Sequence, residues 1–104
     1  MSSYTSISPE KLARLMGTPH APALVDVRTD EDFAVDPRLI PGAMRRSHRD
    51  VDAWVGSVAG RSVVVICHRG QKLSEGAAAW LRHAGIVAEI LDGKLAPVAA
   101  QFAA

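Results

Sequence analysis

The fold is decided by residues 62–73, which read SVVVICHRGQKL. Residues 62–66 form an unbroken, mostly β-branched run, a pattern that predicts a buried β-strand. Cys67 follows this run directly, so the sequence places its only cysteine at the carboxyl end of a strand. Residues 74–82 have a helix-forming composition that ends before Gly85, so strand, loop and helix are expected in that order.

The rest of the chain also alternates predicted strands with predicted helices. Residues 8–17 begin with an N-cap serine followed by a proline, and residues 50–58 place their apolar side chains on one helical face. The predicted strands are 23–27, a short strand after the Pro-Gly turn at 40–43, 62–66 and 87–91; the predicted helices are 8–17, 50–58 and 74–82; residues 29–38 are predicted as loop and turn. We therefore expect an α/β fold in which a small, mainly parallel sheet is flanked by helices on both faces.

Length and composition favour one domain. The chain has 104 residues, of which 48% are hydrophobic, enough for one core and too few for two. We expect a single domain over residues 1–104, with frayed ends at 1–6 and 100–104. The charged fraction of 22% and the net charge of +1 argue against wholesale disorder and against a nucleic-acid partner.

The sequence also gives an expectation about the cellular compartment of the protein. It contains no run of the roughly 18 apolar residues that a membrane span requires, and residues 1–7 lack the basic and apolar pattern of an export signal. Because Cys67 is the only cysteine, an intramolecular disulfide and a cysteine-rich metal cluster are excluded. We expect a soluble cytoplasmic protein with no membrane contact and no metal site.

The segment after Cys67 has the features of an anion-binding loop. If residues 68–73 curl around the sulfur, their N–H groups point inward, and the following helix adds partial positive charge at its N-terminus. Arg69 and Lys72 add full positive charges, and together these groups favour a thiolate over a thiol. Gly70 gives the loop a residue that can take positive φ.

A plainer interpretation of the same residues stays open. A lone cysteine after an apolar strand is often only a small buried hydrophobic residue, and Cys67 fits that description. Arg69 and Lys72 fit ordinary solvated charges, and Gly70 fits a simple turn residue.

Three motifs resemble the rhodanese (sulfurtransferase) family, and they occur along the chain in the same order as in that family. The first is the loop of residues 67–72, with glycine at its fourth position and a basic residue at its sixth. The second is LVDVR at residues 24–28, followed by EDF at 31–33, and the third is the turn IPGA at 40–43. The resemblance spans most of the chain and implies a small α/β domain with a parallel sheet flanked by helices.

The resemblance implies a mechanism and a set of site residues. Cys67 would be the catalytic nucleophile, which takes sulfane sulfur from thiosulfate or a persulfide and passes it to a thiophilic acceptor, without a metal or organic cofactor. Asp26 and Arg28 would support the loop and neighbouring ion pairs rather than make bonds. The implied substrate-binding residues are His68, Arg69, Gly70, Gln71, Lys72 and Leu73.

The chain departs from the family pattern at several positions. Lys72 stands where arginine is common, so the planar two-pronged donor is lost, and Leu73 stands where serine or threonine is common. His68 stands where a basic residue is frequent and would carry charge only in acidic solution. Near the C-terminus Lys94 replaces a glycine and Val98 a tryptophan. The donor and acceptor therefore stay open, as do the oligomeric state and any second domain.

Two other functions compete with sulfur transfer. A non-catalytic module of the same fold could bind a partner protein or a small anion, and Lys72 and Leu73 leave room for this. A phosphatase or arsenate reductase would need a loop one residue longer and closed by arginine, but Leu73 occupies that position. We therefore rank that class last.

A basic cluster follows the turn at residues 40–43. It consists of Arg45, Arg46, His48 and Arg49. One interpretation is a solvated loop; the other is a rim of the active-site mouth that attracts an anionic donor or an acidic protein partner. Trp54 and Trp80, in contrast, are expected to pack in the core or at its edge.

Overall fold

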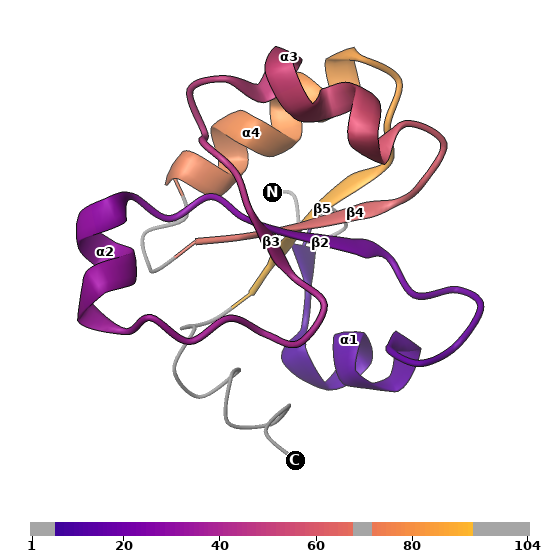
Figure 1. Cartoon of the computed structure of the whole chain (residues 1–104). Coiled ribbons are helices and arrows are strands. Elements are labelled where there is room, and N and C mark those ends of the chain that lie inside the picture. The colour runs from indigo at the N-terminus through magenta and orange to yellow at the C-terminus, as the bar shows by residue number, and fades with distance from the viewer. Residues whose placement is uncertain (1–5, 68–71, 93–104) are drawn as a thin grey trace.

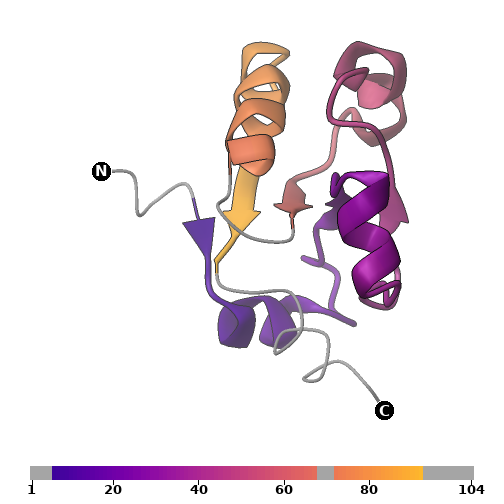
Figure 2. The same cartoon turned by 90° about the vertical axis from the view of Figure 1, so that its left-hand side faces the viewer.

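The computed structural model describes residues 6–67 and 72–92. Within these residues five parallel strands form one sheet in the order β1-β5-β4-β2-β3. Figure 2 shows the same sheet from the left-hand side of Figure 1. The strands are β1 (Ser6–Ile7), β2 (Ala23–Asp26), β3 (Met44–Arg45), β4 (Val63–Ile66) and β5 (Ala88–Leu91).

The helices lie on both faces of this sheet. They are α1 (Pro9–Leu15), α2 (Asp30–Val35), α3 (Val51–Trp54), its 3-10 continuation η2 (Val55–Val58), and α4 (Lys72–His83). Figures 1 and 2 show α3 and α4 on one face, α1 on the other, and α2 beyond the carboxyl ends of the strands. The expected α/β fold with helices on both faces is confirmed.

Alternating side chains of the strands feed two separate cores. Val63 and Val65 of β4 pack on the side of α3 and α4, whereas Val64 and Ile66 pack with Leu12 of α1. Each of these side chains is buried. A strand covered on both faces needs apolar residues at every position, which is why its sequence is an unbroken apolar run.

The register aligns the ends of three neighbouring strands. Asp26 at the end of β2 lies opposite Ile66 of β4 on one side and Arg45 of β3 on the other. The pairing continues one step further, because the Val27 N–H donates to the Ile66 carbonyl at 2.9 Å. The residues that follow β4, β2 and β3 therefore meet at one edge of the sheet, and Cys67 is the residue that follows β4.

The prediction of loop and turn for residues 29–38 was wrong, because the segment contains α2. Thr29 caps this helix by accepting a hydrogen bond from the Asp32 N–H at 3.1 Å. The first turn carries the acids Asp30, Glu31 and Asp32, whose charge suits the positive end of the helix dipole. The charge that suggested a loop therefore stabilises the start of a helix.

Two smaller expectations, for Ser6 and for Trp80, differ from the structure. Ser6, expected in a frayed end, lies in β1 opposite Ile90, whereas residues 100–104 lie outside the described residues. Trp54 is buried as expected, and its Nε1 donates to the Ser47 carbonyl at 2.9 Å. Trp80 was expected in the core or at its edge, but it is 57% exposed on the outer side of α4.

Candidate active site

Cys67 lies between the end of β4 and the start of α4. Its side chain is 8% exposed and belongs to the core on the α3 and α4 side, together with Val65, Ala77 and Ala78. The sulfur is therefore at the border of the core, at the edge of the sheet where the strands end. Among the described residues no group of three or more His, Cys, Asp or Glu side chains could hold a metal ion.

The predicted substrate-binding residues lie only partly within the described structure. His68, Arg69, Gly70 and Gln71 lie outside it, so the inward N–H groups of this loop remain a prediction. Lys72 is the first residue of α4, and Leu73 is half-buried against the core that contains Cys67. Because the 12-residue helix α4 starts five positions after Cys67, the positive end of its dipole faces the region where the strands end.

Asp26 and Arg28 form a buried ion pair at the end of β2. They are 1% and 2% exposed, and Nη2 of Arg28 lies 2.8 Å from Oδ2 of Asp26. Nε of Arg28 donates to both carboxylate oxygens, and the backbone N–H of Arg28 donates to Oδ1 at 3.0 Å. With this many hydrogen bonds the carboxylate is compensated within the protein, as a buried charge requires.

The remaining donors of Arg28 hold the segment after α2. Nη1 donates to the Asp36 carbonyl at 2.6 Å, and Nη2 donates to the Arg38 carbonyl at 2.9 Å. Its guanidinium also lies over the ring of Phe33, with 4.8 Å between Cζ and the ring centroid. Arg28 thus connects β2 to α2 and to the segment behind it.

Arg45 completes this arrangement from the neighbouring strand. Its guanidinium lies over the ring of Phe33, with 4.2 Å from Cζ to the centroid. Nη2 of Arg45 donates to the Arg28 carbonyl at 3.0 Å and to Oδ1 of Asp30 at 3.1 Å. Phe33 therefore contacts two guanidinium groups, and the contacts of Arg45 hold α2 against β3.

A second ion pair joins Asp36 to Arg38 on the surface of the same segment. The hydrogen bond from Arg38 lowers the pKa of the Asp36 carboxyl below its ordinary value, and the charge of Arg38 acts in the same direction. The same contacts raise the pKa of Arg38. Because water screens this pair, we expect it to contribute little to stability.

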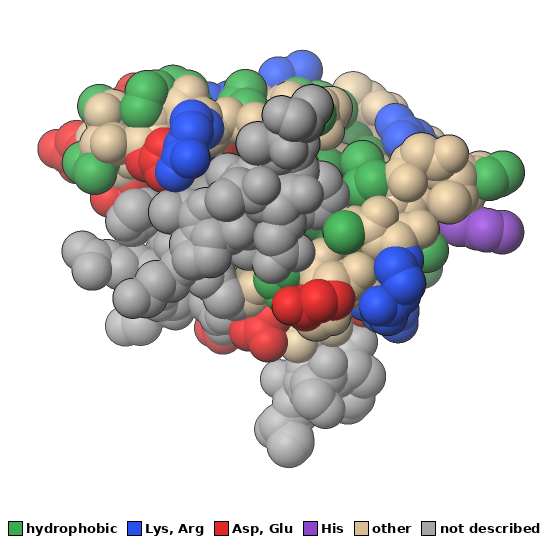
Figure 3. All heavy atoms as spheres, turned by 90° about the horizontal axis from the view of Figure 1, so that it is seen from below, with side chains coloured by type: hydrophobic (Ala, Val, Ile, Leu, Met, Phe, Trp, Pro, Cys, Tyr) green, Lys and Arg blue, Asp and Glu red, His purple; other side chains and the backbone are tan. Residues whose placement is uncertain are grey.

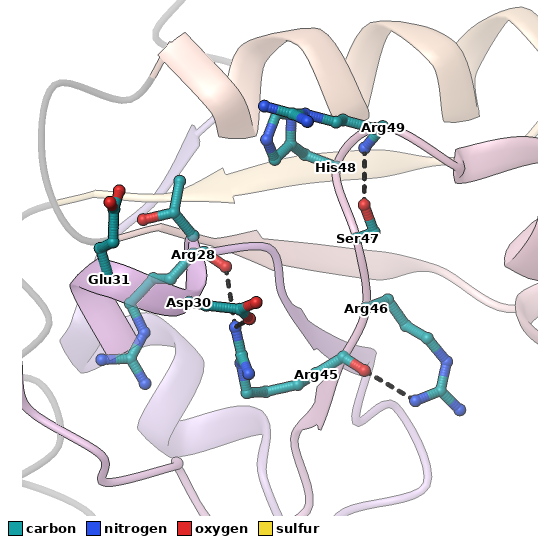
Figure 4. Close-up of a pocket in the computed structure, with 9 residues that line it drawn as sticks. Arg28, Asp30, Glu31, Arg45, Arg46, Ser47, His48 and Arg49 are labelled. Atoms are coloured by element: carbon teal, nitrogen blue, oxygen red, sulfur yellow. Dashed lines mark hydrogen bonds and ion pairs between the residues drawn. The ribbon is translucent and has the colours of Figure 1, made fainter. Parts of the chain in front are cut away.

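A hollow of ≈ 530 Å³ opens where β2 and β3 end. Figure 4 shows α2 on one side of it and the segment from β3 to α3 on the other. This is the edge of the sheet at which Cys67 follows β4. The hollow is lined by Arg28, Thr29, Asp30, Glu31, Arg45, Arg46, Ser47, His48 and Arg49.

Comparison with known proteins agrees with this architecture. The family model described as "Rhodanese-like domain" matches residues 8–96, most of the chain. The chain belongs to the rhodanese-like domain family. No curated protein matches the chain closely enough to suggest a more specific activity.

Solved structures share the fold of this rhodanese-like domain. A full-length protein from Lactobacillus plantarum superposes with a TM-score of 0.76 at 25% identity, over 89% of this chain and 79% of that one. A protein from Staphylococcus saprophyticus gives 0.73 at 23% identity, over 89% of this chain and 91% of that one. Reduced CoADR-RHD from Bacillus anthracis gives 0.70 at 15% identity, covering 93% of this chain but only 16% of its own length.

The basic cluster of the rhodanese-like domain is divided by the fold. Arg45 turns toward Asp30 and Phe33, so its role is structural. Nη1 of Arg46 donates to the carbonyl of Arg45 at 2.8 Å, and its side chain points away from α2 in Figure 4. His48 and Arg49 line the hollow on the side opposite Glu31 (Figure 4).

On the face seen in Figure 3, acidic and basic side chains of the described residues are interspersed.

None of the helices within residues 6–67 and 72–92 has the length and hydropathy that a membrane span needs.

Ser74 is a buried polar residue that the sequence analysis did not single out. It is 0% exposed and shares the inner face of α4 with Ala77, Ala78 and Leu81. Within the described structure its hydroxyl has no hydrogen-bond partner. A buried hydroxyl without a partner costs about 1–3 kcal/mol, because it has lost its water.

We expect the Ser74→Ala variant to be more stable than the wild type. The change removes the unpaired hydroxyl and adds a better helix former, which together favour the native state by about 1–2 kcal/mol. Thermal unfolding should show a melting temperature raised by about 5–10 °C. The control is Ser57→Ala, which deletes a hydroxyl that donates to the Trp54 carbonyl at 2.7 Å and should lower the melting temperature. An equal loss of stability in both variants would mean that the Ser74 hydroxyl is paired in solution.

Proposed function

We propose that this rhodanese-like domain is a sulfurtransferase in which Cys67 carries sulfane sulfur as a persulfide. The observation that carries the proposal is the position of Cys67, at the end of β4, before the N-terminus of α4 and at the edge of the sheet that holds the hollow. In open parallel sheets, ligands bind beyond the carboxyl ends of the strands. Membership of a family in which sulfur transfer is common supports the same function.

The first step transfers the outer sulfur of the donor to Cys67. With thiosulfate, the Cys67 thiolate attacks the outer sulfur, the bond between the two donor sulfurs breaks, and sulfite leaves with the electron pair. The product is a Cys67 persulfide anion, so the total charge is unchanged. A persulfide donor reacts in the same way and releases its thiolate.

The second step returns the enzyme to its starting state. A thiophilic acceptor, such as cyanide or a thiolate, attacks the outer sulfur of the persulfide, and Cys67 leaves as a thiolate. In the proposal residues 68–73 bind the donor, with Arg69 and Lys72 attracting its negative charge. The positive end of the α4 dipole stabilises the anionic persulfide between the two steps. No metal or organic cofactor takes part.

The wild-type protein tests this proposal in two measurements. Incubation with thiosulfate should add the mass of one sulfur atom to the intact protein, and cyanide should remove it with formation of thiocyanate. A protein that neither gains sulfur from thiosulfate or a small persulfide nor forms thiocyanate would overturn the proposal. The domain would then be better described as a binding module of the same fold.

A further inference from the structure

We propose that the hollow beside α2 binds the non-reacting part of an organic sulfur donor that carries both carboxylate and ammonium groups, as the persulfide of a short peptide does. The proposal rests on sulfur transfer at Cys67 and names the class of donor. It follows from the size of the hollow, the charges on its two sides and its distance from the cysteine.

The size of the hollow suits an organic molecule. Its volume of ≈ 530 Å³ falls within the range of about 300–1,000 Å³ that is usual for sites that bind organic ligands. A thiosulfate ion would occupy a small part of this space and would leave most of it to water. A donor with a peptide-sized body would fill it.

The ion pairs inside the protein leave a definite set of charges for a ligand. Arg28 is neutralised by Asp26, and Arg45 forms an ion pair with Asp30, although Nε of Arg45 has no hydrogen-bond partner within the described structure. Glu31 and Arg49 form no ion pair with a described residue. The hollow therefore presents at least one uncommitted charge of each sign.

These charges stand on different elements. Glu31 belongs to α2, whereas His48 and Arg49 belong to the segment between β3 and α3, and Figure 4 shows them on opposite sides of the hollow. A carboxylate of the ligand fits beside Arg49, and an ammonium group fits beside Glu31. An inorganic dianion would gain only the first contact and would be repelled by Glu31.

The sheet sets the distance between the hollow and the reacting sulfur. The strand β2 lies between β4, which leads to Cys67, and β3, which leads to Arg49. Neighbouring strands are about 4.8 Å apart, so the ends of β4 and β3 are separated by about 10 Å. A chain of two or three residues, at about 3.5 Å each, spans that distance.

The test compares donors that differ in the proposed groups. Glutathione persulfide has carboxylates and an ammonium group, its N-acetyl derivative lacks the ammonium group, and thiosulfate has neither. For each donor, kcat/KM would be measured with cyanide as acceptor in wild type, Arg49→Ala and Glu31→Gln. The matched control is Arg61→Ala, because Arg61 is an exposed arginine in the turn before β4, at the other end of the strand.

We expect the two variants to lose selectivity in different ways. Arg49→Ala should lower the ratio of kcat/KM for glutathione persulfide over thiosulfate about tenfold, the usual effect of losing one charged hydrogen bond. Glu31→Gln should lower the preference for glutathione persulfide over its N-acetyl derivative by a similar factor. Arg61→Ala should leave both ratios unchanged.

Two results would contradict the proposal, and they are distinguishable. If wild type turns over all three donors but both ratios are the same in the Arg49 and Glu31 variants, sulfur transfer stands and the donor class is wrong. If no donor places sulfur on Cys67 in the wild type, the proposed function itself fails and this inference fails with it.

Discussion

The Cys67→Ser variant is expected to lose thiocyanate formation by at least about a thousandfold, which is typical of removing a covalent nucleophile. A serine hydroxyl is too weakly acidic to supply an anion at neutral pH. The variant should also gain no sulfur mass after treatment with thiosulfate. Cyanide assay and intact-mass measurement on the same preparation check both statements.

The control for this prediction is the fold of the variant. Cys67 is buried at the border of the core, so a change of side chain could disturb packing as well as chemistry. Serine has nearly the same shape, and Cys67→Ala adds a second variant with no polar atom at the position. If both variants have the circular dichroism spectrum of the wild type and neither forms thiocyanate, the loss of activity is due to the missing thiol. Substantial thiocyanate formation by either folded variant would place the nucleophile elsewhere.

The centre of the fold could be predicted from the sequence because local and tertiary preferences agree there. Residues 63–66 are β-branched and buried on both faces, so strand propensity and burial require the same side chains. The helix after Cys67 has a good helix-forming composition and ends at His83, shortly before Gly85, whose φ of 85° suits a residue without a side chain. Both elements can therefore be predicted from their local sequence alone.

The elements at the edge could not be predicted in the same way. The strand β1 has only two residues, Ser6–Ile7, and exists because β5 offers its free side for pairing. No local pattern can describe such a strand. The helix α2 is different, because Thr29 and the three acids after it form an N-terminal capping signal that the apolar periodicity alone did not reveal.

The candidate site also has one part that could be predicted from the sequence and one part that could not. Cys67 can be found from its place after a strand, but the hollow cannot, since its two sides come from segments that only the pairing of β2 with β3 brings together. The sequence presents Arg45, Arg46, His48 and Arg49 as one basic cluster. The fold assigns Arg45 to Phe33 and Asp30, and leaves His48 and Arg49 at the hollow.

Replacement of Arg28 by methionine should be the most damaging single change outside the cysteine. Methionine keeps an unbranched apolar stem but leaves the buried carboxylate of Asp26 without its counterion, a loss of about 3–5 kcal/mol in the free energy of unfolding. It also removes the donors to the carbonyls of Asp36 and Arg38. For a domain of this size we expect a fall in melting temperature of more than about 10 °C.

The chain provides its own control, because the same pair of residue types recurs at the same spacing on the surface. Asp36 and Arg38 are joined at 2.7 Å, much as Asp26 and Arg28 are at 2.8 Å, but their side chains are 19% and 56% exposed. Water screens the surface pair, so Arg38→Met should leave the melting temperature close to that of the wild type. Thermal or urea unfolding of the two methionine variants measures the effect of burial, because the two ion pairs have nearly the same N–O distance and differ in exposure. Equal losses of stability would show that the buried pair does not hold β2 to the segment after α2.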